Sequence, residues 1–247
     1  MKAMILAAGL GTRLRPLTND RPKALVEING STMLEITLRR LGTFGIRDII
    51  INVHHFADLI VDYLKIHNNF GLHIEISHEQ ILLDTGGGLK KAGWFFLRDA
   101  AGNEPFVLHN VDVISTVDLQ RMALAHKAQE ALVTLAVQER KSSRYLLFDQ
   151  DNHLCGRQKN GEENREIVSG DPRGLKPLAF CGLHIISPQI FSMMRQDGVF
   201  SIVDTYLQLA REGQVIQGYR VDGEYWRDLG KLEQVQQAAQ DLKRTSP

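Results

Sequence analysis

Residues 1–25 read MKAMILAAGLGTRLRPLTNDRPKAL, and this stretch decides the fold class. Its apolar run up to Ala7 is typical of a buried strand, and the chain then turns through Gly9 and Gly11. Because glycine has no side chain, backbone N–H groups in such a turn can approach an anion closely. Three cations follow at once: Arg13, Arg15 and Lys23. Together these features predict a polyphosphate-binding loop.

The spacing of this loop excludes two familiar phosphate motifs. A Walker loop requires Gly-Lys-Ser/Thr four residues after its first glycine, whereas Gly11 is followed by Thr12 and Arg13. A dinucleotide fingerprint requires a third glycine near position 14, which is Leu14. The loop therefore belongs to another class of phosphate-binding turn.

The stretch from Leu6 to Lys23, LAAGLGTRLRPLTNDRPK, resembles the signature of the sugar-1-phosphate nucleotidylyltransferases. These enzymes make nucleotide sugars from a nucleoside triphosphate and a sugar phosphate. The resemblance implies that Arg13 and Lys23 are catalytic: they would contact the triphosphate and neutralise the transition state. Arg15 has two equally good interpretations: it is a solvated surface cation, or it contacts the pyrophosphate. The resemblance also implies that five loop residues bind the nucleotide: Ala7, Ala8, Gly9, Gly11 and Thr12.

A candidate metal ligand follows the apolar strand Phe106 to Leu108, in the sequence Asn110-Val111-Asp112. Ligands of open α/β sheets bind beyond the carboxyl ends of the strands. The segment resembles the family's strand-end motif, usually Asn-Gly-Asp, whose aspartate holds the metal. Asp112 would then be a metal ligand, with Asn110 in the nucleotide site. Since a β-branched residue disfavours positive φ, Val111 in place of glycine predicts a slightly different local backbone.

A second carboxylate lies in residues 225–233, YWRDLGKLE, which resemble the family's late segment Trp-x-Asp-x-Gly-Thr-Pro-Glu. Asp228 would then join Asp112 in holding Mg²⁺ between the α-phosphate and the sugar phosphate. Lys231-Leu232 replaces the common Thr-Pro, which predicts an atypical start of the last helix. The alternative is that Asp228 only caps that helix.

The remaining substrate contacts are expected from two further segments. Residues 84–88, DTGGG, resemble the segment that faces the nucleobase and ribose, which implies contacts from Glu79, Thr85 and Gly86; a flexible hinge is the alternative. Gly182 resembles a glycine of the hexose pocket. A plain buried strand explains its neighbours Phe180 and Cys181 equally well. The family's sugar-phosphate lysine has no clear match, and the two candidates are Lys159 and Lys176.

The pattern of elements predicts an α/β fold. Apolar runs alternate with amphipathic stretches in the first half, as in βαβ units, and strands with antiparallel character follow Asp112. We predict a Rossmann-like three-layer fold with a mixed, mainly parallel sheet, of the nucleotide-diphospho-sugar transferase type that the resemblance implies. It would form a single domain, 1–247, with a nucleotide-binding half (1–115) and a sugar-phosphate-binding half (116–247). Residues 158–174, rich in charge and turn formers, are expected to form a mobile loop.

Composition limits the partners. Lys plus Arg and Asp plus Glu both number 29, so no net field favours nucleic acid or an anionic membrane. Two cysteines provide neither a disulfide framework nor a zinc site. Arg13 and Arg15 come too early for a signal peptide, and nothing approaches the ~20 apolar residues of a membrane span. We expect a cytoplasmic protein without nucleic-acid or membrane partners.

The resemblance implies an enzyme that converts a nucleoside triphosphate and a sugar 1-phosphate to a nucleotide sugar and pyrophosphate, with Mg²⁺ and in-line attack on the α-phosphate. The compact length and the arrangement of Glu79 ahead of DTGGG resemble the family members that transfer a uridylyl group to N-acetylmuramate 1-phosphate, and this resemblance favours that reaction. Alternatives are guanylyl or thymidylyl transfer to mannose, glucose or heptose 1-phosphate, cytidylyl transfer to phosphocholine, and a non-catalytic nucleotide-sugar-binding module. Homo-oligomerisation stays open.

Overall fold

The structure is a computed structural model that describes residues 1–98, 104–159 and 165–245. Its strands are β1 (Ala3–Leu6), β2 (Glu27–Ile28), β3 (Ser31–Thr32), β4 (Asp48–Val53), β5 (His73–His78), β6 (Phe106–Asn110), β7 (Val113–Ser115), β8 (Val133–Gln138), β9 (Arg144–Phe148), β10 (Leu154–Lys159), β11 (Glu166–Ile167), β12 (Lys176–Ile186), β13 (Ile216–Arg220) and β14 (Trp226–Asp228). Its α-helices are α1 (Met33–Thr43), α2 (Ala57–Ile66), α3 (Asp84–Lys91), α4 (Gly93–Leu97), α5 (Leu119–Ala128), α6 (Ile190–Met193), α7 (Ile202–Arg211) and α8 (Leu232–Thr245). Three short 3-10 helices are η1 (Thr12–Leu14), η2 (Lys23–Leu25) and η3 (Asn68–Gly71).

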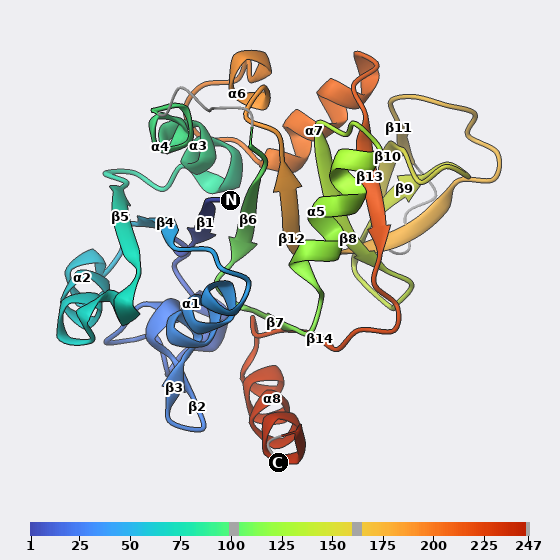
Figure 1. Ribbon diagram of the computed structural model, residues 1–247. Coiled ribbons are helices and arrows are strands. Elements are labelled where there is room, and N and C mark those ends of the chain that lie inside the picture. The colour runs from blue at the N-terminus through green and yellow to red at the C-terminus, as the bar shows by residue number, and fades with distance from the viewer. Residues whose placement is uncertain (99–103, 160–164, 246–247) are drawn as a thin grey trace.

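One large sheet organises the molecule, with strands in the order β11-β10-β9-β12-β6-β1-β4-β5 (Figure 1). The pairs β6–β1, β1–β4 and β4–β5 are parallel, as the βαβ pattern predicts. Strand β12 then joins β6 antiparallel, and β9 continues the antiparallel part. Strand β8 also pairs with β12 and carries β13 in parallel. The predicted mixed α/β fold is confirmed.

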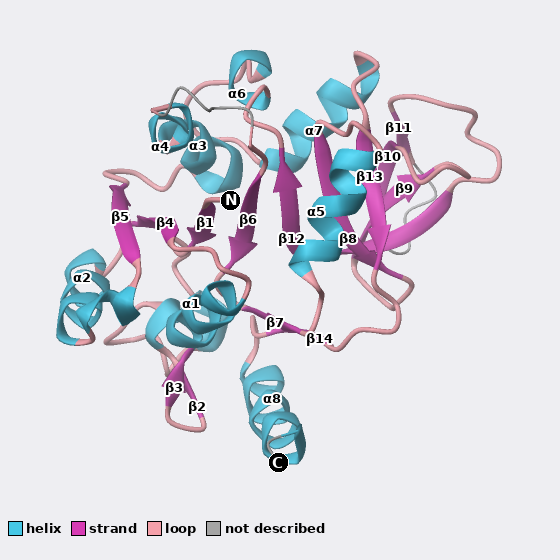
Figure 2. Cartoon of the chain, viewed as in Figure 1, coloured by secondary structure: helices cyan, strands magenta, loops and turns pink. Residues whose placement is uncertain are grey.

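Helices lie on both faces of this sheet (Figure 2). Successive side chains along a strand point to opposite faces, so apolar residues on both faces can pack against helices. On β1, Ala3 and Ile5 pack in one buried cluster and Met4 packs in the other. The first cluster holds apolar residues of α1, α2, α5 and α8, and the second holds those of α3, α4, α6 and α7. The three-layer arrangement follows from this burial of both sheet faces.

Capping side chains fix the start of helices α1 and α7. Thr32 caps α1 by accepting a hydrogen bond from the Glu35 amide at 3.0 Å, and Glu35 adds a negative charge to the first turn. Ser201 caps α7, where it accepts a bond from the Val203 amide at 3.3 Å. None of the helices in the described part of the chain is long and apolar enough to cross a bilayer.

The C-terminal segment returns to the N-terminal half. Strand β14 pairs antiparallel with β7, with Asp228 opposite Val113. Helix α8 packs against the hairpin β2–β3, and Asn29 Nδ2 donates to the Ala239 carbonyl at 2.8 Å. Contacts therefore cross the predicted boundary at residue 115, and the two halves stay a prediction about function.

The expected loop at 158–174 contains strand structure, which corrects that prediction. Strand β10 extends to Lys159, and β11 pairs with it so that Glu166 lies opposite Arg157. Residues 160–164, inside the predicted loop, lie outside the described residues. The alternation of apolar side chains was too weak to predict these strands because edge strands expose polar and charged residues.

Candidate active site

Three parallel strands end beside one another, with Leu6 of β1 in register with Asn52 of β4 and Asn110 of β6. Beyond these ends lies a cavity of about 470 Å³. Its lining includes seven residues of the site predicted from sequence: Ala7, Ala8, Gly9, Lys23, Thr85, Asn110 and Asp112. Segments far apart in sequence therefore meet at the sheet edge where the α/β topology places a ligand.

The other predicted residues lie outside this lining: Gly11, Thr12, Arg13, Glu79, Gly86, Gly182 and Asp228. Gly11 has φ +65°, and a Cβ added there would lie 3.1 Å from the Lys23 side chain. This conformation and this contact both favour glycine. Gly11 therefore allows the turn to pack against Lys23.

Lys23 and Asp112 form the central ion pair of the cavity, since Lys23 Nζ contacts Asp112 Oδ2 directly. The two side chains are 11% and 17% exposed. A pair this sheltered from solvent is screened weakly by salt. Lys23, the cation expected to bind the α-phosphate, is thus paired with Asp112, the carboxylate expected to bind the metal.

Backbone pairing joins the segment that carries Asp228 to the segment that carries Asp112. The Leu229 amide donates to the Asp112 carbonyl at 2.8 Å, next to Asp228 at the end of β14. A Cβ at Gly230 would lie 2.6 Å from Asp228 Oδ1 and 2.9 Å from Arg13 Nη2, so Arg13 and Asp228 meet at this glycine. Each carboxylate of the predicted metal pair therefore has a basic side chain beside it.

Asp228 Oδ1 also accepts a bond from the Gly230 amide at 2.7 Å, ahead of the helix start. The first bonds of α8 run from the Gln234 and Val235 amides to the Lys231 carbonyl. Asp228 thus orders the turn that precedes α8, whose first residue is Leu232. Val111, expected to alter the local backbone, is not among the described residues with positive φ.

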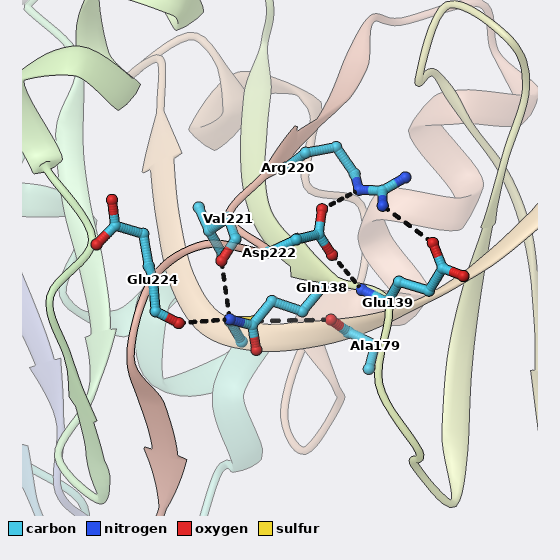
Figure 3. A network of polar contacts seen from close by, with 8 residues as sticks. Gln138, Glu139, Ala179, Arg220, Val221, Asp222 and Glu224 are labelled. Atoms are coloured by element: carbon cyan, nitrogen blue, oxygen red, sulfur yellow. Dashed lines mark hydrogen bonds and ion pairs between the residues drawn. The ribbon is translucent and has the colours of Figure 1, made fainter.

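A polar network holds the connection from β13 to β14, which leads to Asp228 (Figure 3). The buried Gln138 side chain donates through Nε2 to the carbonyls of Val221 at 2.8 Å and Glu224 at 3.0 Å. Asp222 accepts bonds from the Glu139 amide at 2.7 Å and from Arg220 Nε at 2.6 Å. Strand β8 therefore fixes the path of the segment that carries the second carboxylate.

Glu79 lies buried behind the cavity, 1% exposed. Its Oε1 accepts from Asn52 Nδ2 at 2.8 Å and its Oε2 accepts from the Leu83 amide at 2.9 Å. Asn52 Oδ1 in turn accepts from the Ala7 amide at 2.8 Å. This chain of bonds links the glycine loop to the segment before α3 through the Glu79 carboxylate.

The three glycines of α3 pack against other parts of the protein. A Cβ at Gly86 would lie 2.4 Å from the Phe200 ring, and one at Gly87 would lie 2.2 Å from the Gly198 carbonyl. The Gly86 amide donates to the Phe200 carbonyl at 2.9 Å. The glycine run therefore lets α3 approach residues 198–200, while Thr85 faces the cavity.

Gly182 supports the cavity from the adjoining strand β12. It has φ +71°, in an irregular part of the β12–β8 pairing, and a Cβ there would lie 2.9 Å from Asn110 Nδ2. A side chain at this position would displace Asn110 from the cavity wall. The direct neighbour of Gly182 is therefore a residue of the predicted nucleotide site.

A family model described as nucleotidyl transferase matches residues 2–245 of this chain. The chain belongs to this family. The predicted family, and with it the predicted nucleotidyl-transfer class of enzyme, is confirmed.

Similar proteins agree with this assignment. N-acetylmuramate alpha-1-phosphate uridylyltransferase of Caulobacter vibrioides is 36% identical, over 92% of this chain and 91% of that protein. Mannose-1-phosphate guanyltransferase of Neurospora crassa is 29% identical, over 94% of this chain and 61% of that protein. The structure of HddC from Yersinia pseudotuberculosis, complexed with GMP-PN, has a TM-score of 0.74 at 23% identity and covers 98% of this chain and 99% of that one. The last similarity shows a shared fold.

A second cavity of this nucleotidyl transferase, of about 500 Å³, lies among β9, β10 and β12. Its lining includes Lys159 and Phe180, together with Gln158, whose Oε1 is buried without a partner in the described structure. Lys176 lines a different hollow, beside Arg140 and Arg220. Of the two lysines left open by the sequence, Lys159 is thus the one beside Phe180. The strand that carries it could not be predicted, so the sequence could not place this lysine.

Histidines lie buried at the junction of the parallel and antiparallel strands. Burial, with Arg40 as a smaller cause, lowers the pKa of His109 to about 3. Burial, with His109 nearby, lowers the pKa of His184 to about 3. Both rings are therefore neutral at physiological pH, and their role is packing and hydrogen bonding.

Proposed function

We propose that this protein transfers a nucleotidyl group from a nucleoside triphosphate to a sugar 1-phosphate and releases pyrophosphate. The observation that carries the proposal is the sheltered Lys23–Asp112 pair in the cavity at the strand ends. Nucleotidyl transfer needs cations around the phosphates and precise positioning, with little covalent chemistry from the protein. A cavity with a glycine turn, a lysine and a carboxylate supplies these elements.

The residues in and around the cavity would divide the work. Backbone groups of the loop from Ala7 to Gly11 would face the phosphates, and Thr85 would face the nucleoside. Arg13, with its planar fork, would bind the terminal phosphates. Lys23, a mobile point charge, would leave Asp112 and follow the α-phosphate as the sugar phosphate attacks from the opposite side. Because the attacking oxygen is already an anion, no general base is needed.

The chemistry of the two carboxylates fits a magnesium ion. Mg²⁺ in nucleotide sites typically takes one or two carboxylates and fills its other positions with water and phosphate oxygens. Asp112 and Asp228 meet this requirement through the β7–β14 pairing, and no cluster of three or more possible ligands occurs in the described residues. Asp112 and Asp228 would hold the ion, which supplies charge compensation at the phosphates when bound.

The preferred substrates in this proposal are UTP and N-acetylmuramate 1-phosphate. The support is the 36% identity to the Caulobacter vibrioides uridylyltransferase, which extends over nearly the whole of both chains. Such a reaction would use the nucleotide pool of the cytoplasm, where we place the protein. Its partners would be small molecules, and self-association would not be required by this site.

The test is pyrophosphate release with Mg²⁺. UTP, GTP, CTP, dTTP and ATP are each combined with the 1-phosphates of N-acetylmuramate, N-acetylglucosamine, mannose, glucose and heptose, and with phosphocholine. We expect strong release with UTP and N-acetylmuramate 1-phosphate. Release with GTP and mannose 1-phosphate instead would retain the reaction class and overturn the substrates. No release from folded protein in any combination would contradict the proposal.

A further inference from the structure

Two segments of the chain have neighbouring residues at both cavities. Val199 lines the first cavity, and Ser201 and Val203 line the second. Along β12, Phe180 lines the second cavity, and two residues later Gly182 abuts Asn110 of the first. If the nucleotide occupies the first cavity, as the proposed function requires, the acceptor sugar extends into the second.

The second cavity is basic, and its charges differ in how they are balanced. Arg157 lies opposite Glu166 in the β10–β11 pair, and its guanidinium contacts Glu166 at 2.6 Å and also Asp204. Arg144 instead lies opposite Lys159 in the β9–β10 pair. Like charges directly opposite each other on paired strands are destabilising. The residue opposite Arg144 therefore offers it no counter-charge.

The side chain of Arg144 has no hydrogen bond or ion pair with any described residue, although it lines the cavity. A guanidinium presents a planar fork that matches a carboxylate with two parallel hydrogen bonds. The reacting 1-phosphate must reach Lys23 and Asp112 in the first cavity. Since Arg144 borders the second cavity and not the first, the group that it meets lies away from the reacting phosphate.

We infer that Arg144 recognises a carboxylate carried by the acceptor sugar and thereby selects an anionic sugar 1-phosphate over its neutral counterpart. This inference rests on the proposed function for the placement of the sugar. N-acetylmuramate 1-phosphate carries a lactyl carboxylate, and N-acetylglucosamine 1-phosphate is the same sugar phosphate without it. These two compounds therefore isolate the interaction.

The experiment compares both sugar phosphates with the unchanged protein, Arg144→Gln and Arg144→Lys. Binding is measured by calorimetry, and uridylyl transfer is measured as kcat/KM. Arg144→Gln should weaken binding and transfer about 10- to 100-fold for the muramate compound, as expected for a lost charged hydrogen bond, and leave the glucosamine compound nearly unchanged. Arg144→Lys should fall between, because it keeps the charge and loses the fork.

Arg121→Gln is the matched control, since Arg121 is exposed on α5 and pairs only loosely with Asp118 at 3.6 Å. Thermal unfolding checks that each variant is folded. An equal loss for both sugars in Arg144→Gln would place Arg144 at the phosphate and overturn the inference, as would no loss for either. If the unchanged protein binds the muramate compound selectively but transfers no nucleotide, the proposed function fails while the inference stands.

Discussion

The cavity at the strand ends and the cavity beside Phe180, called the first and second cavities above, are built in different ways. The first lies at the ends of parallel strands, where strand register and glycine turns place backbone groups around the Lys23–Asp112 pair. The second lies between antiparallel strands and is lined by long charged side chains such as Arg144 and Arg157. The difference teaches that, in the proposed function, the reaction would depend on topology and a few fixed residues, whereas the choice of acceptor would depend on side chains that can change without altering the fold.

The sharpest test of the first cavity is Asp112→Asn. The change keeps the side-chain shape but removes the charge that pairs with Lys23 and that would hold the metal. We expect kcat/KM to fall by at least about 10²-fold, because catalysis here rests on charge compensation at the phosphates. Steady-state pyrophosphate release measures this, with the exposed Asp62→Asn as the control. Near-normal turnover of a folded Asp112→Asn protein would remove Asp112 from the mechanism.

The junction between the two regions should be sensitive to acid. His109 on β6 lies in register with Leu183 on β12, next to His184, and both histidines have pKa values of about 3. In the unfolded chain histidine titrates near 6.5, so the unfolded state gains protons first as the pH falls. The stability is present in full above about pH 6.5 and declines below it, by roughly 2 kcal/mol per histidine at pH 5.

Urea unfolding between pH 7.5 and 5 measures this decline, and the slope reports the number of protons taken up. His184→Phe should lower the slope of the free energy of unfolding against pH by the equivalent of about one proton, since it removes one of the groups that take up a proton on unfolding. A free energy of unfolding that is constant over this range would show that these rings are accessible to protons in the folded state.

The contrast between the cavities also explains what the sequence could predict. The buried strand, Gly11 and Lys23 follow from short-range patterns, so the fold and most of the first cavity were predictable. The hydrogen bonds of Glu79 were not predictable, because its bonds to Asn52 and Leu83 require knowing how β4 and α3 meet. Polar edge strands carry little periodic signal, and so the wall formed by β10 and β11 remained hidden.

Lys23→Met tests whether the lysine guards the metal site. In the free protein Lys23 forms an ion pair with Asp112, so a metal ion that binds alone must displace the lysine from the carboxylate. When a nucleotide binds together with the metal, Lys23 can pair with a phosphate group instead. We expect the variant to bind Mn²⁺ without nucleotide about tenfold more tightly, and to lose turnover. Calorimetry with Mn²⁺ measures the binding. Lys65→Met, which breaks the exposed pair with Asp62, is the control. Unchanged or weaker Mn²⁺ binding would show that the ion pair does not oppose the metal.

The smallest effect is expected for Glu79→Gln. This variant distinguishes two roles for Glu79: holding the segment before α3 in place, and contacting the nucleobase directly. The amide retains one acceptor, but its NH₂ group must face either Asn52 Nδ2 or the Leu83 amide, both of which are donors. Loosening these hydrogen bonds should raise KM for the nucleotide by about threefold to tenfold, and cost about 1–3 kcal/mol of stability, while the order of preference among UTP, CTP, GTP and dTTP stays the same. A changed order of preference would mean that Glu79 reads the base directly, as the sequence resemblance implies. An unchanged KM with unchanged preference would mean that the first cavity keeps its shape without these hydrogen bonds.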